Sequence, residues 1–458
     1  MMRSLYSGVS GLKVHQTKMD VIGNNIANVN TVGFKSSSVR FSDVYYQTTQ
    51  SASGANEVTG SAGKNATQIG LGASVNAVYT SIATTGGSER TDNPLDIMIN
   101  GDAFFVVNNG GTNYFTKAGS FTVDAAGYLC NYSGYYVMGW PADRATQEVD
   151  IDTVKPLQIM APENLYSAPQ ATTSCTVSGN IDQYDEQISA TSGGRTCQIG
   201  FYDSLGNKFN AKVKVKQDAT DKSLYNVTLV DVLDANNKSI LGTIAGETIT
   251  FGNSEYEIND DGTLGDPDEI TALKFDPATG AFSYIGEDGT KAASLTIPGP
   301  AFRPIDVYFS PLTMYSTSGT TSLEADMGDP EGKGNGKKVG EMTGVSVDKS
   351  GKIYGSYDNG DLILLGQISV ATFNNPAGLE AVGDNLFAQS QNSGQFDGIG
   401  QDPTTGGGSL TTGVLEMSNV DLSTEFTQMI TTQRGFQANS RIITTSDTML
   451  EELINLKR

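Results

Sequence analysis

Few side chains in this 458-residue chain could carry chemistry, because it contains only three cysteines and one histidine. Cys130, Cys175 and Cys197 are 45 and 22 residues apart, which is unlike the short spacings of a zinc site. They suggest no disulfide framework and are expected to be buried or idle thiols. His15 has no acidic residue placed to make a catalytic triad, and is expected to be an exposed helix residue.

Three segments partly match known site motifs, and each lacks an essential element. GKGNGKK at 332–338 lacks the first Gly and the final Ser or Thr of a phosphate-binding loop, so it predicts a basic turn. NDDGTLGDPDE at 259–269 lacks the alternating ligands of a calcium loop and predicts an acidic hairpin. GVSGL at 8–12 lacks the second Gly of a nucleophile elbow. The sequence therefore predicts no enzyme, no catalytic residue, no metal and no cofactor.

Composition favours a β-rich protein of several domains. Hydrophobic residues make up 38% of the chain and charged residues 17%, with 53 glycines to form turns. The formal charge of −22 is concentrated in the middle, since residues 1–40 carry +4 and residues 421–458 carry −1. This acidity argues against nucleic acid or an anionic membrane as a partner.

The amino-terminal residues do not resemble a cleaved secretory signal. Polar residues interrupt every apolar run in residues 1–20, and no stretch is long enough to insert into a membrane. A protein with this sequence would need another route out of the cell.

The two ends are predicted to be long amphipathic helices, at about 5–29 and 418–456, because their apolar residues recur at steps of seven. Ser418 and Asp421 provide a capping start for the second helix. The apolar positions are Leu5, Val9, Leu12, Met19, Ile22, Ile26 and Val29 in the first helix, and Leu422, Phe426, Met429, Ile430, Phe436, Ile442, Ile443, Leu450, Leu453 and Ile454 in the second.

A second line along each helix is mostly polar, and this bears on what the helices pair with. Its members are Gln16, Gly23 and Asn30 in the first helix and Gln433, Ser440 and Asp447 in the second. A self-sufficient two-stranded coil needs both lines to be apolar. We therefore expect each helix to need several neighbours. Pairing of the two ends inside one molecule is an alternative, and it is compatible with further contacts between subunits.

The predicted fold is mainly β with long N- and C-terminal α-helices that pair as a coiled-coil-like assembly domain. Short strands and hairpin turns fill 93–140 and return at 348–373, and the more polar region between them suggests nested β domains. The predicted parts are a helical assembly domain (1–30 plus 418–458), a connector (31–70 plus 389–417), an inner β domain (71–150 plus 305–388) and an inserted outer β domain of one or two subdomains (151–304).

The string GNNIANVNTVGFK at 23–35 resembles the flagellar rod and hook protein family. SLYSGVSGLKVHQTKMDVI before it and residues 418–458 resemble the two terminal segments of that family. LDIMINGDAFFVV, YFTKAGSFTVDAAGYL and residues 365–387 resemble its first β domain. The resemblance covers about half of the chain. The insert at 151–304 is similar to the variable outer domain of hook proteins, which distal rod proteins generally lack.

The resemblance implies a subunit of the bacterial flagellar hook, a curved tube that transmits motor torque to the filament. Such proteins leave the cell unfolded through the flagellar type III apparatus, without a cleaved signal peptide, and polymerise at the distal tip of the extracellular structure. The implied partners are further copies of the chain, the distal rod protein, the hook cap, the hook–filament junction proteins and the export gate. A distal rod protein of the basal body is the nearest alternative. A secreted β-rich surface protein or adhesin would explain the acidity but not the ends.

The resemblance also assigns roles to two short segments. Asn24, Asn25, Asn28, Asn30, Gly33 and Phe34 form the family turn, in which Asn and Gly tolerate left-handed backbone where the helix ends. Local capping and contacts between subunits remain alternatives for these residues. Phe34, Phe41, Val44 and Tyr45 resemble the segment that such proteins present to the export gate, although the same residues could simply pack.

Spirochaetal hook proteins link their subunits through a lysine and a cysteine. Lys155 and Cys175 are candidates for such a pair, but the sequence carries no matching motif, and we predict no crosslink here.

Overall fold

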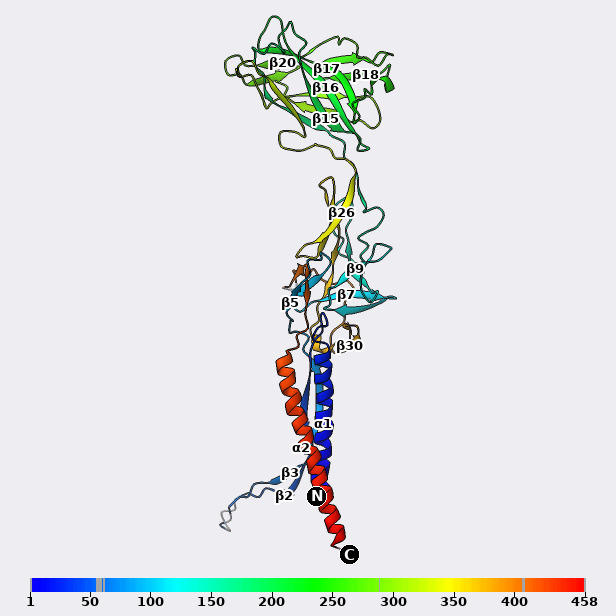
Figure 1. Cartoon of the computed structure of the whole chain (residues 1–458), viewed down its shortest axis with the longest axis vertical. Helices are drawn as coiled ribbons and strands as arrows, with labels where there is room; N and C mark the ends of the chain where they lie inside the picture. Colours follow the sequence, from blue (N-terminus) through cyan, green and yellow to red (C-terminus); the bar gives the residue numbers. More distant parts are fainter. Residues whose placement is uncertain (1, 55–59, 61, 288, 406–407, 457–458) are drawn as a thin grey trace. The chain divides into compact units, whose positions relative to one another are not determined.

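The computed structural model describes residues 2–54, 60, 62–287, 289–405 and 408–456. The chain forms two compact units (Figure 1). Unit 1 comprises Met1–Asn164, Val345–Gly355 and Ile363–Arg458, and unit 2 comprises Leu165–Gly344 and Ser356–Leu362. Residues 55–59, 61 and 406–407 of the predicted connector, and residues 1, 457 and 458 of the predicted helical domain, lie outside the described residues.

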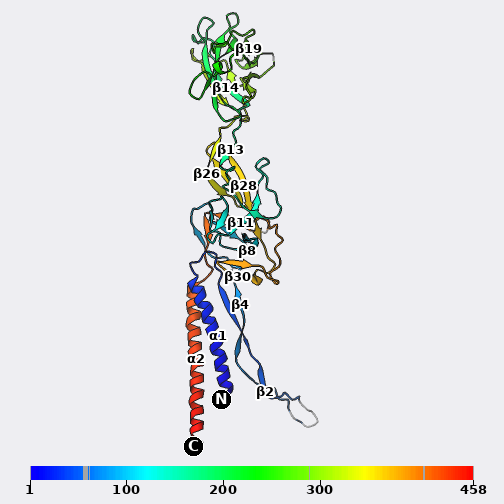
Figure 2. The ribbon, with the colours of Figure 1, turned by 90° about the vertical axis from the view of Figure 1, so that its right-hand side faces the viewer.

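Both predicted terminal helices are present, as α1 (Met2–Ala27) and α2 (Leu422–Asn455), and the two lie side by side in unit 1 (Figure 2). The predicted cap at Ser418 is wrong. Asp421 is the N-cap, and its carboxylate accepts a hydrogen bond from the Ser423 N–H at 2.9 Å. Asp421 satisfies one of the unpaired amides of the first turn, so the cap lies three residues later than the predicted capping start, and the helix begins at Leu422, where its apolar pattern begins.

The first predicted connector segment is largely β structure. β1 (Ser37–Asp43) pairs with β4 (Ala73–Thr80), and β2 (Tyr46–Gln50) pairs with β3 (Thr67–Gly70), all antiparallel. β1 and β4 also contact α1. A two-stranded ribbon is marginal alone in water, so this contact with the helix stabilises the β1–β4 ribbon.

The remaining β structure of unit 1 brings together segments that are far apart in sequence. β7 pairs with β8, β11 and β29, and β31 pairs with β8, so residues 370–388 complete a sheet begun at 104. Phe104, Phe115 and Trp140 are fully buried in its core. The strands are β5 (Ser88–Arg90), β6 (Ile97–Asn100), β7 (Phe104–Asn109), β8 (Thr112–Thr116), β9 (Phe121–Val123), β10 (Leu129–Asn131), β11 (Tyr136–Pro141), β12 (Lys155–Pro156), β29 (Val370–Ala371), β30 (Glu380–Gly383), β31 (Leu386–Ala388), β32 (Ser409–Thr412) and β33 (Val414–Glu416).

Three strands have residues in both units: β26 (Gly340–Val347), β27 (Lys352–Tyr357) and β28 (Leu362–Ile368). The short strand β13 (Tyr166–Ser167) of unit 2 pairs with β26.

Unit 2 contains a five-stranded and a seven-stranded sheet that share one hydrophobic core. The five-stranded sheet has β15 (Arg195–Tyr202), β16 (Lys208–Gln217), β17 (Leu224–Asp234), β20 (Thr271–Phe275) and β21 (Phe282–Ile285). The seven-stranded sheet has β14 (Ser174–Asn180), β18 (Thr248–Phe251), β19 (Ser254–Glu257), β22 (Ala292–Thr296), β23 (Ile305–Tyr308), β24 (Leu312–Thr313) and β25 (Ser322–Met327). Along β16, buried Ala211, Val213 and Val215 alternate with lysines, as expected of a strand with one face in a core.

The predicted fold class is confirmed, but the predicted limits of the outer domain differ from the observed division. The prediction ended that domain at residue 304, whereas β23, β24 and β25 all pair with β14 inside the seven-stranded sheet. Two of these pairings are parallel and join residues more than a hundred positions apart. Such long-range pairing leaves no local signal in the sequence.

The Tyr256 hydroxyl provides a test of the shared core. This buried oxygen accepts a hydrogen bond from the Leu229 N–H at 3.0 Å. Tyr256→Phe leaves that amide without a partner, and we expect the free energy of unfolding of unit 2 to fall by about 1–3 kcal/mol. Native-state hydrogen exchange of the Leu229 amide measures this change. Tyr315→Phe, at an exposed position, is the matched control. Equal protection in Tyr256→Phe and Tyr315→Phe would contradict the assignment.

Candidate assembly site

α1 and α2 run antiparallel and meet through small and polar residues. A Cβ added at Gly11 would lie 2.6 Å from Asn439 Nδ2, and one at Gly435 would lie 2.7 Å from His15 Cε1. Nearer the other end of α1, Asn25 Nδ2 donates to Glu425 Oε1 at 3.0 Å. This polar seam brings the two backbones close together, while Val14 and Ile22 are buried beside it and many other apolar side chains of both helices keep contact with water.

His15 occupies the middle of the polar seam, so its predicted exposure is wrong. The imidazole is half-buried and packs edge-on to Phe41 at 6.2 Å between ring centroids. Its Nδ1 is buried and has no hydrogen-bond partner among the described residues. Burial, followed by the nearby Lys18 charge, lowers the pKa of His15 below 6.5. The neutral form of the ring therefore fits this seam.

Of the predicted assembly positions, only Ile22 is fully buried. The half-buried positions are Leu5, Leu12, Met19, Ile26, Val29, Met429, Ile443 and Leu450. The exposed positions are Val9, Leu422, Phe426, Phe436 and Leu453. A single copy therefore leaves most of both apolar lines in contact with water.

The exposed positions belong to a larger set of exposed apolar side chains on the two helices, which we call the apolar stripe. It consists of Met2, Tyr6, Val9, Leu422, Phe426, Ile430, Phe436, Ile442, Met449, Leu453, Ile454 and Leu456. Near the end of α2 it includes a groove of about 390 Å³ lined by Thr448, Met449, Glu452, Leu453 and Leu456. Large exposed apolar surfaces on soluble proteins mark sites of interaction.

The family turn combines local and long-range bonds. The backbone N–H and the side-chain Nδ2 of Asn28 both donate to the Asn24 carbonyl, which is local capping. Asn25 instead also joins α1 to β1, since its Nδ2 donates to the Ser37 carbonyl and its Oδ1 accepts from the Ser37 N–H. Asn30 is exposed. This one turn therefore contains local bonds within the turn, at Asn28, and longer-range bonds to β1, at Asn25.

Gly33 is the point where this turn reaches the β structure of unit 1. Its φ is +69°, and an added Cβ would lie 2.8 Å from the Ala118 nitrogen. Its N–H donates to the Glu416 carbonyl at 2.8 Å. Positive φ and close approach together require glycine at this position. Phe34, the next residue, is half-buried.

The adjacent residue forms a buried ion pair that the sequence did not reveal. Lys35 Nζ lies 2.7 Å from Glu416 Oε1 and also donates to the Thr84 carbonyl, and both charged side chains are almost fully buried. Asn419 adds bonds to the Ser36 N–H and to the Ser81 carbonyl. We call these residues the junction, because they join the segment after α1 to the segment before α2. In the sequence, the lysine directly after Gly33 and Phe34 was the only sign of this ion pair.

Lys117 is a second buried lysine near the junction. Its Nζ donates to the Gly101 carbonyl at 2.6 Å and lies 5.0 Å from the centre of the Phe104 ring. Burial lowers the pKa of Lys117 to about 8, although the Glu416 carboxylate opposes that shift. An extra cation beside an ion pair is poorly solvated here, so its charge costs stability.

The residues predicted to contact the export gate occupy the β1–β2 region in the folded chain. Phe41 packs on His15, Val44 donates its N–H to the Gly72 carbonyl, and Tyr45 is 85% exposed. Tyr45 is the more exposed of the two aromatic side chains, since Phe41 is 40% exposed.

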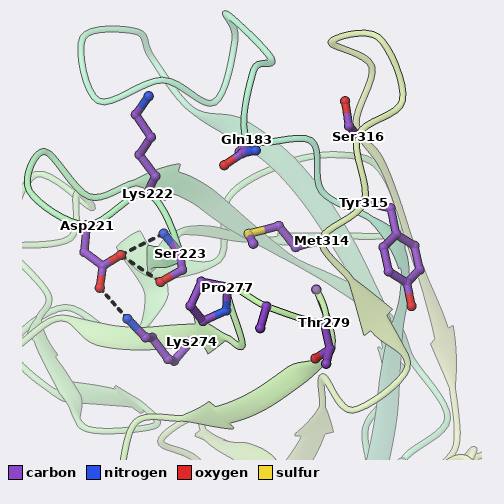
Figure 3. Close-up of a pocket in the computed structure, with 12 residues that line it drawn as sticks. Gln183, Asp221, Lys222, Ser223, Lys274, Pro277, Thr279, Met314, Tyr315 and Ser316 are labelled. Atoms are coloured by element: carbon purple, nitrogen blue, oxygen red, sulfur yellow. Dashed lines mark hydrogen bonds and ion pairs between the residues drawn. The ribbon is translucent and has the colours of Figure 1, made fainter.

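A polar hollow of about 470 Å³ lies in unit 2 (Figure 3). The Lys274 ammonium bonds to the Asp221 carboxylate and holds the pKa of Asp221 at about 2. The Ser223 hydroxyl donates to the same carboxylate, which is a local turn rather than a nucleophile paired with a base. Within the described ranges, no group of three His, Cys, Asp or Glu side chains could hold a metal ion.

The three cysteines are free and buried. Burial raises the pKa of the Cys175 thiol to about 12 and that of Cys197 to about 11, so both are protonated in this state. Neither described helix is long and apolar enough to cross a membrane.

Three family models match the chain. The flagella basal body rod protein model matches residues 5–35, the flagellar hook protein FlgE/F/G D1 domain model matches 98–180, and the flagellar basal body rod FlgEFG protein C-terminal model matches 411–456. The terminal models coincide with the helices and the junction. Together they define an axial protein of the bacterial flagellum.

Full-length relatives specify the family. The chain is 36% identical to the flagellar hook protein FlgE of Borreliella burgdorferi and 33% identical to that of Treponema pallidum, each over 100% of both chains. It is 29% identical to the flagellar basal-body rod protein FlgG of Bacillus subtilis, also over 100% of both. Length alone therefore does not separate hook from rod, and the higher identities favour the hook. The chain belongs to the flagellar hook protein family, whose members are structural subunits of the flagellum that polymerise with copies of themselves.

The junction ion pair should be costly to break from one side. Lys35→Met leaves the Glu416 carboxylate buried without its cation, and we expect the free energy of unfolding of unit 1 to fall by about 3–5 kcal/mol. Denaturant unfolding followed through Trp140, the only tryptophan, measures this change. Arg90→Met, in the exposed pair with Asp92 of the same unit, should cost about 0–1 kcal/mol. Equal losses in Lys35→Met and Arg90→Met would contradict the role of burial.

Lys117 should give unit 1 a distinct pH dependence. The pKa of Lys117 is about 8 in the folded chain and 10.5 for a free lysine side chain, so between these values the unfolded chain binds one more proton. Stability should therefore rise with pH through this window, by about 1–3 kcal/mol relative to Lys117→Met. Unfolding of both proteins from pH 7 to 10.5 measures the difference. Lys349→Met, which removes an exposed charge, should leave the slope unchanged; parallel profiles for Lys117→Met and the unmodified chain would refute the assignment.

Proposed function

We propose that α1 and α2 form the assembly domain of a hook subunit, through which copies of this chain build a curved tube that transmits motor torque to the filament. The observation that carries this proposal is the apolar stripe left exposed by the polar seam. Burial of such surface is the main driving force of association. The helices can bury it only against further copies.

With the outer domain extended past residue 304 to include β23, β24 and β25, the four predicted parts remain our working division of the chain. The helical ends would form the inner tube, and the β structure of both units would form its outer layers. The turn and junction would fix how each helix leaves the β structure of unit 1. The assembly positions and turn residues predicted from the sequence keep these proposed roles.

The proposed partners follow from the family. The chain would contact the distal rod protein at one end of the hook, and the hook cap and hook–filament junction proteins at the other. It would leave the cell through the type III export gate, presenting Phe34, Phe41, Val44 and Tyr45, and function outside the cell without a cleaved signal. We propose no catalysis, no binding of nucleic acid and no membrane insertion. The acidity of the chain argues against nucleic acid and anionic membranes as partners.

Two charges on the apolar stripe should stop polymerisation without unfolding the monomer. Phe426 and Phe436 are exposed in one copy, so Phe426→Asp with Phe436→Asp should leave monomer unfolding nearly unchanged. In a tube, the same carboxylates would be buried without partners. Salt-induced polymerisation followed by electron microscopy should then yield no tubes.

Thr431→Asp with Ala438→Asp is the matched control, because both positions are exposed and lie about 120–160° around α2 from Phe426 and Phe436. This control should still form tubes. Normal tubes from the Phe426 and Phe436 variant would show that the apolar stripe faces solvent in the polymer, and would contradict the proposal.

A further inference from the structure

The lysines of β16 create an unusual surface on unit 2. The unit is acidic, with 13 Lys and Arg against 27 Asp and Glu. Four of those 13 cations nevertheless lie on one side of one strand, alternating with core residues. We call this set the basic face: Lys208, Lys212, Lys214 and Lys216.

Little in the same copy neutralises the basic face. Across from Lys214 lie Thr196 and Thr228, and across from Lys216 lies Asn226. Asp231 lies across from Lys212, but its carboxylate accepts from the Ser239 hydroxyl at 2.6 Å. In the described part of the chain, none of the four lysines has a carboxylate within 4.0 Å.

The other sheet presents the opposite charge. Glu255 and Glu257 alternate with buried Ser254 and Tyr256 along β19, so they point away from the core. The same alternation exposes carboxylates on β23 and β25. We call this set the acidic face: Glu255, Glu257, Asp306, Glu324 and Asp326. The seven strands of this sheet contain no lysine or arginine.

Within one copy the basic and acidic faces lie on different sheets. The two sheets share the core between them and adjoin at one edge, where β15 contacts β25, so most of their outward side chains point in different directions. In a second copy, however, the acidic face is available to the first copy's basic face. Such a contact leaves the acidic face of the first copy and the basic face of the second copy free, so the same contact can repeat along an open assembly.

We propose that the basic face of unit 2 in one copy binds the acidic face of unit 2 in a second copy. This proposal rests on the proposed polymerisation and adds a second contact to that of the helices. Charge complementarity would set which copies are neighbours and their register, more than it would add affinity. The contact should weaken as salt rises, because exposed charges are screened within about 10 Å at 0.1 M salt.

Charge reversal with rescue tests the pairing in the full chain. One variant carries Lys212→Glu, Lys214→Glu and Lys216→Glu, a second carries Glu255→Lys, Glu257→Lys and Glu324→Lys, and a third carries all six changes. Sedimentation gives the critical concentration for polymerisation. Each single-face variant should raise it roughly tenfold at about 0.05 M salt and less at about 0.5 M. The six-change variant should return close to the unmodified value, because its faces are again complementary.

The matched control replaces three exposed lysines outside the basic face: Lys238→Glu, Lys291→Glu and Lys333→Glu. It changes the net charge as much as the first variant and should polymerise nearly normally. Circular dichroism of each monomer checks folding.

The inference is overturned if the single-face variants match the unmodified chain, if the control is equally weakened, or if the six-change variant is not rescued. Unmodified chain that forms no polymer would refute the proposed function itself, and this inference with it.

Discussion

The two terminal helices meet through glycine, asparagine and histidine, and this contact constrains the rest of the molecule. Gly11 against Asn439 and His15 against Gly435 bring the backbones close, so the larger apolar side chains are left to either side. A single copy thereby orders two long helices while leaving much of their apolar surface in water. Ordering backbone costs about 1–2 kcal/mol per residue, and unburied side chains do little to offset it. The helices therefore gain most from neighbours, which agrees with a family that functions as a polymer.

The junction transmits this constraint to the β structure of unit 1. Lys35 and Glu416 come from opposite ends of the sequence, and their pairing requires both segments to fold together. Gly33 permits the close approach, since any side chain there would strike the backbone at Ala118. A helix pair that is loose in isolation is thus attached to the sheets through a buried, directional contact. Breaking the ion pair would disturb how the helices leave the sheets while their apolar stripe remained intact.

The sequence predicts the elements of this fold better than it predicts their contacts. Seven-residue steps identified both helices, and alternation with turns identified a β-rich middle, because those signals are local. The same steps could not show that α1 and α2 would pair through Gly11 and Gly435 rather than through the apolar lines. The limit at residue 304 failed for a similar reason, since β14 pairs with strands far along the chain. The alternation of lysines with apolar residues along β16 could be seen in the sequence. The fact that the other sheet of unit 2 carries acidic side chains could be recognised only once the strand pairing was known.

Hydrogen exchange of α2 in monomer and polymer tests the central claim most directly, because exchange reports local opening residue by residue. The account predicts that amides of residues 422–455 exchange rapidly in the monomer and become strongly protected in the tube. Amides of β7 and β16 should be protected in both states. Equal protection of α2 in monomer and tube would contradict the account, since it would show that a single copy already stabilises its helices.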